Sequence, residues 1–355
     1  MKSYFRPEID ALAGYVAGEQ PKIPDLIKLN TNENPFPPSP QVAEVLRKFD
    51  IARLRRYPDP FADELRDAFA AACNLKRENI IAGNGSDDLL TMIFRAFTDN
   101  NRPVAVFDPS YSLYPVLAAM QGAPVIKVPL TGENFDYPDA ASTLQQCKNA
   151  NLLVITRPNA PTGNLAAKTW VETVCAGFDG IVLIDEAYAD FADDNCMELA
   201  GKYDNVLVMR TFSKSLSMAG VRLGFAAGNP VLIEGLMKLK DSYNLDMLSQ
   251  AVALANYNDR EYQRKCLDII LAERQKLSAA LGGLGFHVVP SQANFLFASP
   301  ADGDGEACFK YLREAAIIVR YFKGERTGKF VRITIGTPEE NAKLVAVLSK
   351  KYSGA

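Results

Sequence analysis

The segment TFSKSLSMAGVRLGF, residues 211–225, places a lysine directly after a stretch of β-branched and apolar residues. That stretch predicts a buried strand, so Lys214 would stand at the carboxyl end of the strand. A lysine that enters a protected cleft is partly desolvated, which lowers its pKa and makes the neutral amine a nucleophile for aldehydes. The hydroxyl group of Ser213 and the guanidinium of Arg222 could hold a phosphate beside it. In isolation, a solvated lysine and arginine on an ordinary loop would explain the same residues.

Short apolar runs alternate with helical stretches on both sides of this segment. The expected strands lie at residues 79–82, 104–108, 124–128, 152–156, 181–185, 206–211 and 223–227. Helices are expected between several of them, at residues 87–97, 112–120 and 168–175. This alternation predicts an α/β fold with a mostly parallel, seven-stranded sheet covered on both faces. In such a sheet ligands bind at the carboxyl ends of the strands, where Asn84, Asp108, Asn159, Asp185 and Lys214 fall.

Changes in composition divide the chain into three parts. Residues 1–40 are rich in proline, with NTNENPFPPSP at 30–40, and predict an extended arm associated with the small domain. Residues 41–245 hold the alternating strands and helices of the large domain. Residues 246–355 predict a smaller α+β domain, with strands expected at 286–290, 294–298, 317–320 and 330–336.

The segment VLIDEAYADF, residues 182–191, carries an apolar run straight into Asp185. A carboxylate at the inner end of a buried strand needs a partner, preferably a cation. A protonated pyridine nitrogen would serve, because the pair keeps the ring able to accept electrons. Tyr188, three residues later, could donate to a phenolate oxygen. The alternative is a metal-binding carboxylate, but the chain has no phosphate loop of the form GxxxxGK[ST] to accompany it.

Two further turns follow predicted strands. In TRPNAPTGN, residues 156–164, two prolines and a glycine fix a turn that could aim the Asn159 amide at a ligand, although such turns are common. In IIAGNGSDDLL, residues 80–90, a strand, a glycine turn and a helix start could bind one phosphate at Gly85, Ser86 and Asp87. The dinucleotide fingerprint GxGxxG fails there because Asp88 stands at the third glycine position.

Composition excludes several classes of protein. The 355 residues carry a net charge of −3 and a single histidine, His287, which we expect to have a structural role at a strand edge. Serine–histidine and cysteine–histidine hydrolase sites and multi-histidine metal sites would all depend on that one residue, so no metal is expected. The charge argues against nucleic acid as a partner. Six scattered cysteines and the absence of a signal peptide or a long apolar run predict a cytoplasmic protein without a membrane span.

A lysine, a phosphate site, an arginine, a buried carboxylate and hydroxyl or amide donors together complement pyridoxal 5′-phosphate (PLP). The motifs that carry them are Ser213–Lys214 with AGVRLGF, DEAY at 185–188 and PNAPTG at 158–163, and they resemble the fold-type I, aspartate aminotransferase-like PLP enzymes. NENPFPP at 32–38, RYPDP at 56–60, VR at 319–320 and VRITIGTPEEN at 331–341 are similar to the histidinol-phosphate aminotransferases. The resemblance extends over nearly the whole chain.

The resemblance implies roles for individual residues. Lys214, Asp185 and Tyr188 would be the catalytic group, with Lys214 bonding the cofactor aldehyde and moving the proton of the substrate α carbon. Cofactor contacts are implied for Gly85, Ser86, Asp87, Tyr111, Asn159, Asp185, Tyr188, Ser213, Lys214 and Arg222, and for Tyr57 of a neighbouring subunit. Substrate contacts are implied for Tyr15, Asn34, Arg320 and Arg332. A homodimer would therefore be the catalytic unit, with Tyr57 reaching the neighbouring active site.

The implied reaction is transamination between L-histidinol phosphate and 2-oxoglutarate, which gives imidazole acetol phosphate and L-glutamate. Two enzymes on the same fold are alternatives, an aromatic amino acid aminotransferase and a threonine-phosphate decarboxylase. A PLP-binding sensor or carrier without turnover is an alternative of another class, and the joint presence of Lys214, Asp185, Tyr188 and Arg222 argues against it.

Overall fold

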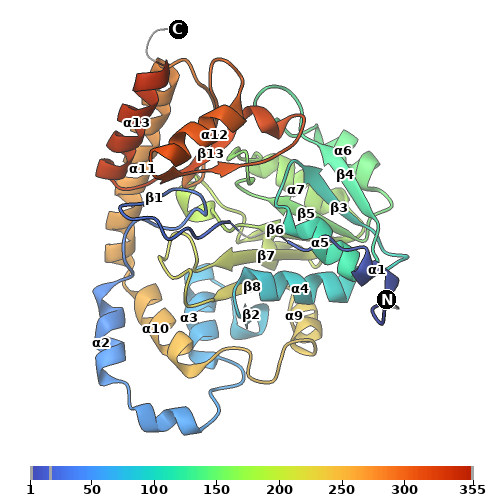
Figure 1. Ribbon diagram of the computed structural model, residues 1–355. Helices are drawn as coiled ribbons and strands as arrows, with labels where there is room; N and C mark the ends of the chain where they lie inside the picture. Colours follow the sequence, from blue (N-terminus) through green and yellow to red (C-terminus); the bar gives the residue numbers. More distant parts are fainter. Residues whose placement is uncertain (1–2, 16–17, 353–355) are drawn as a thin grey trace.

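A seven-stranded sheet forms the centre of the larger part of the chain in the computed structural model, which describes residues 3–15 and 18–352 (Figure 1). In spatial order its strands are β2 (Ile80–Gly83), β8 (Gly224–Gly228), β7 (Val206–Thr211), β6 (Ile181–Asp185), β5 (Leu152–Thr156), β3 (Val104–Asp108) and β4 (Val125–Pro129). All neighbours are parallel except that β8 runs antiparallel to both β2 and β7. The mostly parallel seven-stranded sheet expected from the sequence is confirmed.

Helices cover both faces of this sheet because its strands are apolar on both sides. In β7, for example, Val206 and Val208 belong to one core cluster, whereas Leu207 and Met209 belong to the other. One face is covered by α4 (Ser86–Phe97), α5 (Leu113–Met120) and α9 (Pro230–Met237). The other face is covered by α3 (Asp63–Cys73), α6 (Ala140–Cys147), α7 (Lys168–Gly177) and α8 (Leu199–Lys202).

A smaller antiparallel sheet forms the centre of the second part of the structure. Its strands are, in spatial order, β12 (Arg320–Tyr321), β13 (Val331–Thr334), β10 (Phe295–Ser299) and β9 (His287–Val289). The helices α11 (Arg260–Gly283), α12 (Gly305–Glu314) and α13 (Pro338–Tyr352) pack against it through a separate apolar core (Figure 1). His287 is exposed at the start of β9, and its Nε2 atom lies 3.3 Å from the Glu133 carbonyl oxygen, in keeping with a structural position at a strand edge.

The N-terminal segment packs first beside α5 of the larger part, then crosses to the smaller part and returns to the larger one. After the short helix α1 (Pro7–Asp10), the strand β1 (Ile27–Lys28) pairs in parallel with β11 (Ile317–Ile318). The chain then passes through α2 (Pro40–Lys48), where Pro40 occupies the first turn and the Ser39 side chain caps the helix by accepting from Gln41 N–H.

The helix α10 (Met247–Asn258) packs against α2 and α3, so the core of the larger part continues past residue 245. The division at 40 and 245 stays a prediction. No helix within residues 3–15 and 18–352 is long and apolar enough to cross a bilayer. The same residues contain no cluster of three or more His, Cys, Asp or Glu side chains placed to bind a metal ion.

Candidate active site

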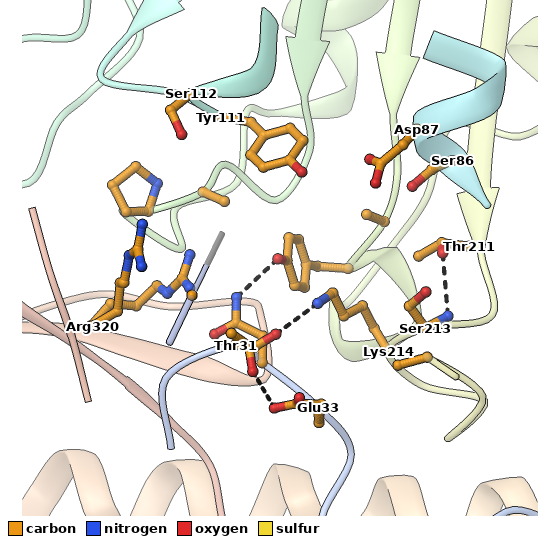
Figure 2. Close-up of a pocket in the computed structure, with 18 of the residues that line it drawn as sticks. Thr31, Glu33, Ser86, Asp87, Tyr111, Ser112, Thr211, Ser213, Lys214 and Arg320 are labelled. Atoms are coloured by element: carbon orange, nitrogen blue, oxygen red, sulfur yellow. Dashed lines mark hydrogen bonds between the residues drawn. The ribbon is translucent and has the colours of Figure 1, made fainter. Parts of the chain in front are cut away.

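A cavity of about 300 Å³ lies at the carboxyl ends of β5, β6 and β7 and is closed on its other side by residues of β12 and β13 and of the N-terminal segment. Eleven of the site residues expected from the sequence line it: Tyr15, Ser86, Asp87, Tyr111, Asp185, Tyr188, Ser213, Lys214, Arg222, Arg320 and Arg332. Figure 2 shows Lys214 pointing towards Thr31, with Ser86 and Asp87 above Lys214 in the view and Arg320 on the opposite side of the cavity. Four expected residues, Asn34, Tyr57, Gly85 and Asn159, are not on the wall.

Lys214 follows β7 and its amine is enclosed by protein. The Nζ atom donates a hydrogen bond to the Thr31 carbonyl oxygen at 2.9 Å, and it lies 5.8 Å from the centre of the Tyr188 ring. Burial, assisted by the positive charge of Arg332, lowers the pKa of Lys214 to about 8, while Glu33 and Asp87 oppose the shift. The amine is therefore much closer to neutrality at physiological pH than an exposed lysine.

Asp185 is buried at the end of β6 without an ion-pair partner in the described part of the chain. Its carboxylate accepts hydrogen bonds from the Tyr114 hydroxyl at 2.7 Å and from Ala187 N–H at 3.1 Å. Burial raises the pKa of Asp185 to about 6, although these two donors act in the opposite direction. A buried carboxylate with a raised pKa and an open cavity in front of it is suited to a cationic ligand group.

At the start of α4 the cavity wall is formed by Ser86, Asp87, Ser213 and Arg222, and this part of the wall is called the recess below. Gly85 has φ of +84°, and a Cβ atom there would come within 2.7 Å of an Arg222 nitrogen, so glycine is required at this turn. Arg222 donates to Ser213 Oγ and to Asp87 Oδ2, each at 3.3 Å. Free N–H groups at the start of the helix, a guanidinium and a hydroxyl together can bind an anion, and Gly85 shapes the recess without lining it.

Three aromatic side chains surround the middle of the cavity. The Tyr188 hydroxyl accepts a hydrogen bond from Asn32 Nδ2 at 2.9 Å, and its own proton remains available to a ligand. Tyr111 and Tyr15 meet edge to face with their ring centres 5.9 Å apart. Burial raises the pKa of both Tyr188 and Tyr111, so both side chains remain neutral donors at physiological pH.

Two arginines stand on the small-domain side of the cavity. Arg332 of β13 lies between the rings of Phe295 and Phe322, at 5.2 Å and 5.3 Å, and donates from Nη2 to the Asn30 carbonyl oxygen. Its Nε atom is buried and has no hydrogen-bond partner among the described residues. Arg320 of β12 stacks on Phe322 at 5.6 Å. The unsatisfied donor on Arg332 is suited to an oxygen of an anionic substrate.

Asn159 and Asn34 are committed to the protein itself. Asn159 is fully buried, and its Nδ2 atom donates to the Pro109 carbonyl oxygen at 3.0 Å and to Thr162 Oγ1 at 2.7 Å. Asn34 donates to the Ser215 carbonyl oxygen at 3.0 Å, which ties the N-terminal segment to the loop that carries Lys214. Both residues lie next to the cavity and support its wall.

Tyr57 is 77% exposed and stacks on Tyr243 with ring centres 4.3 Å apart, away from the cavity of its own chain. Sequence reasoning missed Thr31 and Glu33, which line the cavity beside Lys214, and Tyr114, which contacts Asp185. The polar run at 30–34 was a usable signal for the first two. No pattern distinguishes Tyr114 from an ordinary core tyrosine of an apolar helix.

Comparison with known proteins places the chain in a family. The family model for class I and II aminotransferases matches residues 24–348. A curated relative from Bordetella parapertussis, named histidinol-phosphate aminotransferase 1, is 42% identical over 99% of this chain and 100% of its own length. The chain belongs to the histidinol-phosphate aminotransferases of class I and II. A further member of this family, from Acinetobacter baumannii strain SDF, is 42% identical over 98% of this chain and 97% of its own.

Solved structures share the fold of this histidinol-phosphate aminotransferase family member. The enzyme of that name from Sinorhizobium meliloti, solved with pyridoxal-5′-phosphate, matches with a TM-score of 0.89 over 99% of this chain and 98% of its own, at 23% identity. Aspartate aminotransferase from Thermus thermophilus with maleate matches with a TM-score of 0.80 over 92% and 91%, at 22% identity. The expected fold-type I architecture is confirmed.

Proposed function

We propose that this chain is a PLP-dependent enzyme that transfers an amino group between L-histidinol phosphate and 2-oxoglutarate, in histidine biosynthesis. The observation that carries the proposal is the cavity that Lys214, Asp185 and three arginines share. The names of its relatives favour this reaction over the aromatic aminotransferase and threonine-phosphate decarboxylase alternatives.

The residues present fit PLP. Asp185 has a raised pKa and no cationic partner in the described chain, and the Gly85 turn with Ser86, Ser213 and Arg222 forms an anion recess. Asp185 would pair with the ring nitrogen, and the recess would hold the phosphate. When bound, PLP supplies an aldehyde that condenses with amines and a ring that accepts electrons.

Other residues would orient the ring and move the proton. Tyr111 would pack on the ring and the Tyr188 hydroxyl would donate to its phenolate oxygen, with Asn159 supporting that edge from behind the wall. The Lys214 amine would take the proton from the substrate α carbon and return it to another atom on the same face of the cofactor. An amine with a pKa of about 8 is well matched to this uptake and release of a proton.

The lysine assignment predicts a pH dependence. We expect the rate at which the unliganded protein reacts with PLP to rise with pH to a midpoint near 8 and then to level off, because only the neutral amine attacks an aldehyde. Glu33→Gln removes a negative charge that favours the ammonium form, so its midpoint should lie at lower pH. Stopped-flow absorbance between pH 6 and 10 measures this. The control is Glu44→Gln on the exposed side of α2, which should keep the parent midpoint, and a parent midpoint near 10.5 would contradict the assignment.

Arg332 and Arg320 would bind the phosphate or carboxylate groups of the substrates. Tyr15 and the part of the cavity wall that Asn34 supports would close the site. We expect Arg332→Ala to raise KM for acidic substrates about 10- to 100-fold, because a buried charge-assisted pair is lost. PLP should remain bound, as measured by its visible absorbance. Release of PLP instead would mean that Arg332 binds the cofactor anion. Arg326→Ala, outside the cavity wall, is the control.

A transamination assay tests the reaction itself. Purified protein with PLP is given L-histidinol phosphate, L-phenylalanine or L-threonine phosphate separately, each with 2-oxoglutarate, while glutamate and CO₂ are measured. Strong preference for histidinol phosphate is expected. Preference for phenylalanine would replace the substrate class, and CO₂ from threonine phosphate would replace the reaction type.

The proposal includes a homodimer, in which Tyr57 reaches the cavity of the neighbouring subunit. Support comes from exposed apolar side chains in the same stretch of the chain, Leu46, Ile51, Leu54 and Phe61, and from exposed Tyr243, which stacks on Tyr57. When the inactive Lys214→Ala variant is mixed with a Tyr57→Ala variant, dimers with one subunit of each kind should form. One site of such a dimer is intact, because it combines Lys214 of one subunit with Tyr57 of the other. Sedimentation at a single-chain mass would reject the dimer. We also propose that the protein is cytoplasmic, since all six cysteines are free thiols.

A further inference from the structure

Tyr114 lies behind the cavity wall, on α5, and is fully buried. Its hydroxyl group is 2.7 Å from Asp185 Oδ2 and 2.8 Å from Thr156 Oγ1. The contacts continue from Thr156 Oγ1 to Ser110 Oγ at 3.0 Å, and from Ser110 Oγ to Asn159 Oδ1 at 2.9 Å. Four hydrogen-bond contacts therefore connect Asp185 to Asn159. In the proposed function, the Asp185 carboxylate faces one edge of the cofactor ring and the Asn159 amide supports another edge.

The two ends of this series can accept but not donate when Asp185 is ionised. The orientation of the Asn159 amide is fixed, because its Nδ2 atom faces the Pro109 carbonyl oxygen, which only accepts. Three hydroxyl groups supply three protons for four contacts, so one contact lacks a proton. A proton on Asp185 supplies the fourth, and every contact is then a hydrogen bond.

We propose that Tyr114 is a positioning residue for Asp185, and that the series through Thr156 and Ser110 couples the proton on Asp185 to the amide of Asn159. The inference rests on the proposed PLP function and adds Tyr114, which lies behind the cavity wall, and Thr156 and Ser110, whose side chains belong to that wall. Other ionisable groups around Asp185 are Asp87 on α4, Glu186, which is paired with Arg210 of β7, and Tyr188. None of them joins the series.

Removal of single hydroxyl groups has different consequences along the series. Tyr114→Phe removes the one side-chain donor that the ionised Asp185 carboxylate has in the described part of the chain. Asp185 should then hold a proton shared with the cofactor more strongly, and the ring nitrogen should carry less of it. Thr156→Val instead leaves two protons for two contacts, and the Tyr114 proton is then free to serve Asp185 alone. The ring nitrogen should therefore lose proton density in the first variant and keep it in the second.

Tyr137 provides a matched control for Tyr114. It is half-buried, and its hydroxyl donates to the Thr156 backbone carbonyl at 3.0 Å, but it has no contact with Asp185. Tyr137→Phe therefore removes a tyrosine hydroxyl from the same neighbourhood and leaves the series intact.

The experiment uses protein loaded with PLP labelled with ¹⁵N in the ring. In Tyr114→Phe the nitrogen resonance should move from the pyridinium position towards that of neutral pyridine, and the PLP dissociation constant should rise roughly tenfold. Thr156→Val and Tyr137→Phe should both keep the pyridinium position, and Tyr137→Phe should keep a PLP dissociation constant within about twofold of the parent. Thr156→Val also serves if Tyr114→Phe does not fold, because a shift towards neutral pyridine in Thr156→Val contradicts the proton count.

Equal ¹⁵N positions in Tyr114→Phe and Tyr137→Phe would overturn the inference alone and leave the proposed function intact. Failure of the parent protein to bind PLP would overturn the proposed function and this inference together. Transamination of a different amino donor by the parent would change the substrate assignment but not the ¹⁵N comparison.

Discussion

Lys214→Ala is expected to lower kcat for transamination by at least about 10⁴-fold, which is the largest effect of any single substitution. The substitution removes both the amine that bonds the cofactor and the base that moves the α proton. The visible absorbance of lysine-bound PLP should disappear, although the phosphate recess can still retain the cofactor without a covalent bond. Absorbance spectra and steady-state turnover measure the two losses separately.

The control for this substitution is Lys202→Ala. Lys202 is exposed, pairs with Glu172 and ends α8, just before β7. It should keep both the absorbance and the turnover of the parent. A Lys214→Ala protein with normal turnover and an unchanged spectrum would refute the assignment of the nucleophile. Lys214→Arg, which keeps a positive charge but cannot bond an aldehyde, should be as inactive as the alanine variant.

Asp185→Asn should have the second largest effect, with kcat about 10²- to 10³-fold lower, because a neutral amide cannot hold a positive charge on the cofactor ring. The size of the side chain is unchanged, so packing at the end of β6 is preserved. Asp108→Asn is the matched control, since Asp108 ends the nearby strand β3 but is exposed and lies outside the cavity. Turnover of Asp185→Asn within a factor of two of the parent would contradict the assigned role.

The same variant has an effect on stability in the absence of PLP. The pKa of Asp185 is about 6 in the folded protein against 3.8 for an ordinary aspartate, so ionisation of this group opposes folding. The penalty is complete above pH 6, on the order of 2–3 kcal/mol, and vanishes as the pH falls below about 4. Asp185→Asn should therefore resist urea better than the parent at pH 8 and lose that advantage near pH 4. Equal stability of the two proteins at pH 8 would contradict the raised pKa.

Much of the fold and part of the site could be predicted because local sequence determines them. Runs such as Leu152–Thr156 are buried throughout and apolar up to their last residue, and the breakers after them mark where each strand ends. In a parallel sheet, residues at those ends meet whatever their separation in sequence, which is why Asp185, Ser213 and Lys214 could be placed at one cavity.

The remaining features depend on tertiary packing that no local pattern encodes. Asn159 stands behind the wall because the Pro109 carbonyl and Thr162 take up its amide group. Tyr114 has the sequence context of a core residue, and its function follows only from the distance to Asp185. Thr31 reaches Lys214 across 183 positions of sequence because the N-terminal segment is held against β11, which the composition of that segment does not reveal.

The attachment of the N-terminal segment to the far end of the chain has a consequence for biosynthesis of the protein. Asn32 N–H donates to Thr334 Oγ1 at 3.0 Å, and Thr334 N–H donates to the Leu29 carbonyl at 3.0 Å, so these early residues are held by residues that are synthesised much later. A nascent chain whose β13 has not yet emerged from the ribosome lacks these contacts, even if the large sheet has already folded. The acceptor of Lys214 is thus among the last features to form, and a prematurely terminated chain would have a folded sheet without a competent active site.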